Sequence, residues 1–93
     1  MFKITMGKGF HMTFDNGLTI SIQFGFGNYC ENRNKFDLIN SKVDIQCEDC
    51  EIAVWDKHGD FITNLFIDCH GDDVRGYLST DQVADIIYKV KDY

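Results

Sequence analysis

Residues 24–34, FGFGNYCENRN, bring together glycines, aromatic rings, amide side chains and a guanidinium group. Glycine lets backbone amides approach a ligand closely, and aromatic rings offer flat surfaces for stacking. Amide side chains recognise the edge of a base or of another amide, while arginine binds phosphate or carboxylate groups. The candidate ligand-binding residues are therefore Gly25, Phe26, Gly27, Asn28, Tyr29, Asn32 and Arg33.

The same stretch also fits a purely structural role. A bulged strand exit uses glycines, buries its aromatic rings in the core and forms turns with its asparagines. The stretch is not a dinucleotide-binding fingerprint, because Cys30 replaces the third glycine of G-x-G-x-x-G and no helical pattern follows. The two interpretations differ in where the side chains of Phe26, Tyr29 and Arg33 point.

Four cysteines form the second group with potential chemistry. A C-x-x-C pair followed at a distance by Cys-His resembles half of a zinc ribbon, although the second half lacks the two-residue spacing. Acidic neighbours disfavour a redox role, because they oppose formation of a thiolate. Small buried thiols are the alternative, and we expect no cofactor unless zinc binds. The candidate metal ligands are Cys30, Cys47, Cys50 and Cys69.

Acidic side chains are concentrated in the second half of the chain. Residues 1–43 carry a net charge of +2 and residues 44–93 a net charge of −8, within a total of −6. Such a surface disfavours direct binding to nucleic acid or anionic membranes and suits a basic protein partner, although it also serves solubility. The candidate partner-binding carboxylates are Glu48, Asp49, Glu51, Asp68, Asp72 and Asp73.

The three histidines do not form a recognisable catalytic motif. His11 falls on the polar side of a predicted strand, His58 in a predicted turn and His70 in a predicted loop. Nucleophilic catalysis needs a nucleophile, a base and an orienting group, and no spacing in the chain indicates such a set. We therefore expect a non-enzyme.

The elements that position these residues begin with a hairpin over residues 10–24. A two-residue loop would set Phe14 against Thr19, whereas a three-residue loop, Asp15 to Gly17, sets Phe14 against Leu18. Only the second choice collects the apolar side chains on one face, since a slip of one residue turns every side chain over. We therefore predict a type I turn with Gly17 in the left-handed conformation.

A second hairpin is predicted over residues 51–67, with Asp56 capping a turn and Gly59 at positive φ. Residues 2–6 are expected to add a short strand.

At the C-terminus, Ser79 and Gln82 form the pattern of a capping box, and an apolar stripe follows at helical spacing. The predicted fold is α+β in a single domain, residues 1–93. It is an antiparallel sheet built from two hairpins, with one C-terminal helix packed on one face.

Size and composition set the remaining expectations. A chain of 93 residues has a modest core, so oligomerisation would add useful burial. The N-terminus lacks the apolar core of a signal peptide and no run is long enough to span a membrane, so we expect a cytoplasmic protein.

Three segments carry a resemblance: KGFHMTFDNGLTISIQFGFGNYCENR, EIAVWDKHGDFI and DDVRGYLSTDQVADII. Together they resemble a group of small uncharacterised proteins encoded by phages and prophages. The resemblance implies an accessory protein acting inside a bacterial host cell, of the kind that counters antiviral defence. The implied partner is a bacterial immune protein bound through the acidic surface or, alternatively, a nucleotide-derived immune signal bound by residues 25–34. A small zinc-stabilised adaptor is the third alternative.

Overall fold

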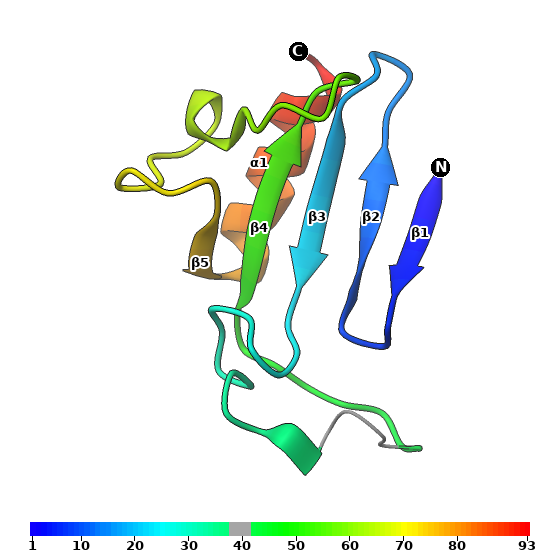
Figure 1. The fold of residues 1–93 in the computed structure, drawn as a ribbon, viewed down its shortest axis with the longest axis vertical. Coiled ribbons are helices and arrows are strands. Elements are labelled where there is room, and N and C mark those ends of the chain that lie inside the picture. Colours follow the sequence, from blue (N-terminus) through cyan, green and yellow to red (C-terminus); the bar gives the residue numbers. More distant parts are fainter. Residues whose placement is uncertain (38–41) are drawn as a thin grey trace.

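The computed structural model describes residues 1–37 and 42–93. Five strands form one antiparallel sheet in the order β1-β2-β3-β4-β5, which is also their order in the sequence. The strands are β1 (Phe2–Thr5), β2 (Gly9–Thr13), β3 (Thr19–Gln23), β4 (Cys50–Trp55) and β5 (Arg75–Leu78). A 3₁₀ helix, η2 (Thr63–Leu65), lies between β4 and β5, and the helix α1 (Thr80–Lys91) packs behind β3, β4 and β5 (Figure 1). The predicted α+β class is confirmed.

The first hairpin has the predicted register. Phe10 pairs with Ile22 and Met12 with Ile20, and the Phe14 amide donates to the Leu18 carbonyl at 2.9 Å. Gly17 has φ +87°, the left-handed conformation that the three-residue loop requires. The strand expected near the N-terminus is also present, as β1, and it pairs with β2.

The second predicted hairpin keeps its turn but loses most of its return strand. Gly59 has φ +85°, and the Asp56 carboxylate accepts hydrogen bonds from the amides of His58 and Asp60. The return segment then pairs only briefly, through the bond from the Asp56 amide to the Asp60 carbonyl, the bridge between Trp55 and Phe61, and the bond from the Ile62 amide to the Val54 carbonyl. The rest of the β4 edge pairs with β5, which the sequence pattern did not predict.

The helix begins as predicted. The Ser79 side chain accepts a hydrogen bond from the Gln82 amide, and the Gln82 side chain accepts one from the Ser79 amide. Val83, Ile86 and Val90 are buried against the apolar face of the sheet. The turn of the first hairpin contacts the C-terminal end of the helix, where the Asn16 side-chain amide donates to the Val90 carbonyl at 2.8 Å. No helix among the described residues is long and apolar enough to cross a membrane.

Register divides the sheet into two chemically different faces. One row across four strands is Phe2, Met12, Ile20 and Val54, and the next is Ile4, Phe10, Ile22 and Ile52. The opposite face carries His11, Ser21 and Ala53 in a row. The first face packs against α1 at β3 and β4, so the core lies between the sheet and the helix.

Candidate binding loop

Carboxylates from the start of β4 hold the backbone of the loop formed by residues 24–34. The Glu51 carboxylate accepts hydrogen bonds from the Tyr29 amide at 2.8 Å and from the Asn28 side chain at 3.4 Å. Asp49 accepts one from the Glu31 amide at 2.7 Å. Two carboxylates predicted to face a partner are therefore engaged within the chain, where they fix the loop.

Asn32 is a buried part of the loop, 1% exposed. Its amide nitrogen donates to the carbonyls of Phe24 at 3.2 Å and Gln46 at 3.1 Å, so it joins the exit of β3 to the segment that leads into β4. Within the described residues, its Oδ1 atom is buried and has no hydrogen-bond partner. Buried polar atoms are nearly always paired, so this oxygen has unused capacity to accept a hydrogen bond.

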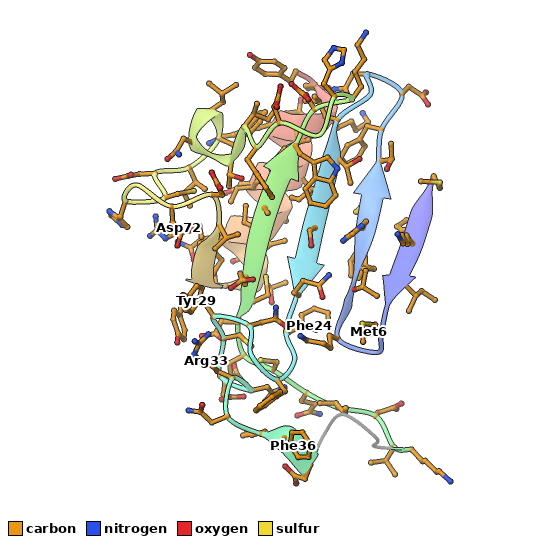
Figure 2. The ribbon with its side chains drawn as sticks, in the orientation of Figure 1. Met6, Phe24, Tyr29, Arg33, Phe36 and Asp72 are labelled. Atoms are coloured by element: carbon orange, nitrogen blue, oxygen red, sulfur yellow. The ribbon has the colours of Figure 1, made fainter. Side chains whose placement is uncertain are left out.

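Tyr29 and Arg33 form a stacked pair on the surface. The guanidinium carbon lies 4.3 Å from the centre of the tyrosine ring, and the Arg33 side chain also donates to the Gly27 carbonyl at 3.0 Å. Figure 2 shows Tyr29 and Arg33 together beside the loop. Arg33 was predicted to bind an anionic ligand, but here its guanidinium is oriented by the loop itself.

The Tyr29 backbone is joined to β5. The Tyr77 amide donates to the Tyr29 carbonyl at 2.9 Å, and a Cβ atom at residue 76 would lie 2.3 Å from the Tyr29 Cβ. Only glycine therefore fits at position 76 while the loop is docked. Tyr77 has φ +56°, a conformation that is strained for a tyrosine, and its side chain is 59% exposed. Strained residues of this kind cluster at functional sites.

A cleft of about 750 Å³ opens on the other side of the loop. Phe24, Gly25, Phe26 and Asn32 line it from the loop, and Lys8 lines it from the β1–β2 turn. The remaining lining comes mainly from residues 43–48, including the acidic side chains of Asp44 and Glu48, and from Thr80. The volume falls within the range of small-molecule sites.

Three of the candidate ligand residues border the cleft, and two of them make contacts there that the sequence does not predict. The Phe26 ring packs edge-on against Phe36 with 5.2 Å between centroids, and Phe26 is 37% exposed. Gly25 makes room for a neighbour, because a Cβ atom there would lie 2.8 Å from Cγ of Lys8. Thus Phe26, Gly25 and Asn32 line the cleft, whereas Asn28, Tyr29 and Arg33 are not among its lining residues.

The cysteines are free thiols, and three of the four are buried. Burial raises the pKa of Cys30 to about 11 and that of Cys50 to about 12, and nearby thiols and carboxylates add to both shifts. Burial also raises the pKa of Cys69. This residue lies in the separate loop that precedes β5, where its thiol donates to the Ile67 carbonyl. Among residues 1–37 and 42–93, no group of His, Cys, Asp or Glu side chains is arranged to hold a metal ion.

The remaining candidate carboxylates lie in the loop at residues 68–73. Asp68 accepts a hydrogen bond from the His70 amide at 2.9 Å, and Asp72 accepts one from the Asp73 amide at 2.7 Å. The Arg75 side chain donates to the Asp68 carbonyl. Because β5 follows directly, this acidic loop and Tyr29 lie on the same side of the molecule (Figure 2).

Sequence reasoning missed Lys8 and Tyr77 as site residues. Lys8 lies between two glycines and outside every predicted strand and helix, so the sequence gives no sign of a site there. Tyr77 follows a glycine and precedes the buried Leu78, but nothing in its sequence neighbourhood signals a positive φ angle. Comparison of the chain with protein-family models, with curated proteins and with solved structures gave no match.

Proposed function

We propose that this chain is a non-catalytic binding protein that docks on another protein through a surface formed by Tyr29, Arg33 and Tyr77. The observation that carries the proposal is the Arg33–Tyr29 stack, in which the loop orients a half-buried guanidinium against an exposed tyrosine ring. Tyrosine and arginine are enriched among the residues that dominate protein–protein binding energies. A side chain that is already ordered loses little conformational entropy on binding.

The acidic loop beside this surface indicates the chemistry of the partner. Asp68, Asp72 and Asp73 lie just before β5, and residues 44–93 carry a net charge of −8. Charges at the rim of an interface mainly accelerate association with a partner of opposite charge. The proposed partner is therefore a protein with a basic face, such as one that binds nucleic acid. The resemblance to phage and prophage proteins supports a bacterial antiviral defence protein as this partner. Binding would then inhibit the activity of the defence protein.

The test is binding to a panel of purified bacterial defence nucleases, with Tyr77→Asn as the decisive variant. Asparagine tolerates the left-handed conformation, so this change removes the ring while keeping the backbone. We expect affinity for a bound nuclease to fall by about tenfold or more, and association to slow as salt rises. Tyr88→Asn, an exposed tyrosine on α1, is the matched control. Unchanged affinity of Tyr77→Asn, or no binding to any nuclease, would contradict the proposal.

A second candidate function is sequestration of a nucleotide-derived signal in the cleft beside the loop. The specific observation that favours it is the unpartnered Oδ1 atom of Asn32, which matches the exocyclic amine of a base. Phe26 offers a ring for stacking, and Lys8, which also lines the cleft, carries a positive charge that would attract a phosphate. Because Asp44 and Glu48 also border the cleft, a nucleoside or a monophosphate suits it better than a polyphosphate.

Thermal-shift measurements with cyclic nucleotides and ADP-ribose derivatives test this second candidate. A ligand present at about 100 times its Kd should raise the free energy of unfolding by about 2.7 kcal/mol. Phe26→Ala should abolish the shift, whereas Tyr29→Ala, which changes the other side of the loop, should retain it. The absence of any shift across the panel would rule out this use of the cleft for the ligands tested.

A further inference from the structure

The apolar face of the sheet extends beyond the helix that covers it. The side chains of Phe2, Ile4, Phe10, Met12 and Phe24 form what we call the open sheet face, and α1 covers β3, β4 and β5 (Figure 1). Phe2 is 71% exposed and Ile4 is 82% exposed. The rings of Phe2, Phe10 and Phe24 follow one another at centroid distances of 6.3 and 6.5 Å. A contiguous apolar surface of this kind marks an interaction site.

This face is hollowed rather than flat. A groove of about 510 Å³ is lined by Phe2, Ile4, Gly7, Gly9, Phe10 and Phe24. A second hollow, of about 270 Å³, shares Phe10 and Phe24 with the first and reaches Val83, Ala84 and Ile87 of α1. The depression therefore runs from the free edge of the sheet to the flank of the helix.

We propose that the open sheet face binds a second copy of the same chain in a two-fold symmetric dimer, in which the β1–β2 halves of the two sheets pack face to face. Stacked sheets lie about 10 Å apart, and a helix with its side chains is about 10–12 Å across. The partner's sheet would therefore lie beside α1, at about the same distance from the first sheet as the helix. Each copy would complete the core of the other.

The chemistry of the open sheet face favours an apolar partner surface, such as the same face of a second copy, over a basic protein. Residues 1–14 contain no Asp or Glu, so the open sheet face offers no complement to a basic protein. The α1 residues that line the second hollow are uncharged. Glu48 and Asp49 also line that hollow, but neither of them lines the groove beside β1.

The available area is also suitable. An aromatic side chain buries about 150–250 Å², so the open sheet face and the adjoining helix flank amount to roughly 500 Å² of apolar surface in each copy. A standard interface buries about 800 Å² per partner, including its polar rim. A two-fold axis pairs the same patch on both copies, which closes the assembly at two chains.

Sedimentation and light scattering between about 1 and 200 µM test the proposal. The expected species is twice the 10.7 kDa mass of the chain. Ile4→Lys should raise the dissociation constant by more than about 100-fold and leave the far-ultraviolet circular dichroism unchanged, because this side chain is exposed in the single chain. Leu65→Lys, an exposed leucine in η2, is the matched control and should still dimerise. A wild-type chain that stays monomeric at 200 µM, or equal dissociation of both variants, would overturn the proposal.

Amide hydrogen exchange separates face-to-face packing from strand pairing. Met1 exchanges two hydrogen bonds with Thr13, so by alternation the backbone groups of Phe2 and Ile4 point toward the free edge of β1. In a face-packed dimer these two amides remain unpaired and exchange quickly. Slow exchange that appears only at dimerising concentrations would show edge-to-edge pairing instead, and the face-to-face arrangement would be wrong.

Discussion

Several polar side chains around the 24–34 loop bind backbone groups of the chain itself. Asn32 donates to two carbonyls, Glu51 accepts from the Tyr29 amide, and Asp49 accepts from the Glu31 amide. The sequence shows that these residues can form hydrogen bonds but not with which partner, because a side chain that can bind a ligand can equally bind the backbone of a nearby loop. The residues that stay exposed are therefore the better candidates for function.

Asn32→Ala tests how much the buried amide contributes. The substitution leaves the carbonyls of Phe24 and Gln46 without this donor, and a buried group without a partner costs about 1–3 kcal/mol. We expect the free energy of unfolding, measured with urea, to fall by that amount. Asn34→Ala is the matched control because Asn34 is exposed, and it should change the value by less than about 0.5 kcal/mol. Equal effects of the two substitutions would contradict the role assigned to Asn32.

At the scale of elements, local patterns predicted the first hairpin and the helix. Register in the hairpin followed from matching apolar side chains across one face, and the start of α1 followed from Ser79 and Gln82. Both signals involve residues close in sequence, so no tertiary information was needed.

The return strand of the second hairpin was mispredicted for a tertiary reason. The Thr63 hydroxyl accepts a hydrogen bond from the Val54 amide at 2.8 Å and donates to the Asp73 carbonyl at 2.7 Å. The Thr63 side chain therefore occupies the place of a strand partner beside Val54. The first half of β4, at Cys50 and Ile52, pairs with β5 instead. Three-way contacts of this kind leave no periodic signal in the sequence. The positive φ angle of Tyr77, within β5, is equally invisible.

Ser79→Ala tests the capping box. The Gln82 amide loses its acceptor, and an N-cap serine typically contributes about 1 kcal/mol. We expect the urea midpoint to fall accordingly with the m-value unchanged. Thr80→Ala, one residue further on and exposed, controls for the loss of a hydroxyl at the helix start. A larger loss for Thr80→Ala than for Ser79→Ala would mean that the cap is not the stabilising contact.

For the whole molecule, buried titratable groups set how stability depends on pH. Burial lowers the pKa of His11, and the nearby Lys3 charge lowers it further. Burial raises the pKa of Cys30, Cys50 and Cys69. The histidine and the thiols are thus held in their neutral forms in the folded state, whereas the unfolded chain titrates them near their ordinary values.

We expect the free energy of unfolding to decline on both sides of a plateau between about pH 6.5 and 9. Below the plateau the unfolded chain takes up a proton at His11 before the folded chain does. Above it the unfolded chain loses thiol protons first, so stability falls as pH rises toward about 11 and 12, the pKa values of Cys30 and Cys50. Urea unfolding at one-unit pH steps measures the curve. Stability that rises from pH 8 to 10 would contradict the prediction, and Cys50→Ala should flatten the alkaline slope.

The identical order of strands in space and in sequence also bears on how the fold is acquired. Each strand pairs with its predecessor, so the sheet can grow by successive additions without a crossover. The β2–β3 hairpin closes a loop of three residues, 15–17, inside the Phe14–Leu18 hydrogen bond, whereas joining β3 to β4 closes the connection from residue 24 to residue 49. Closure of that connection is therefore the expected slow step, and the Asn32 bonds to Phe24 and Gln46 lie across its base. The buried side-chain amide of Asn32, which shapes the loop in the folded state, would then also hold this connection closed during folding.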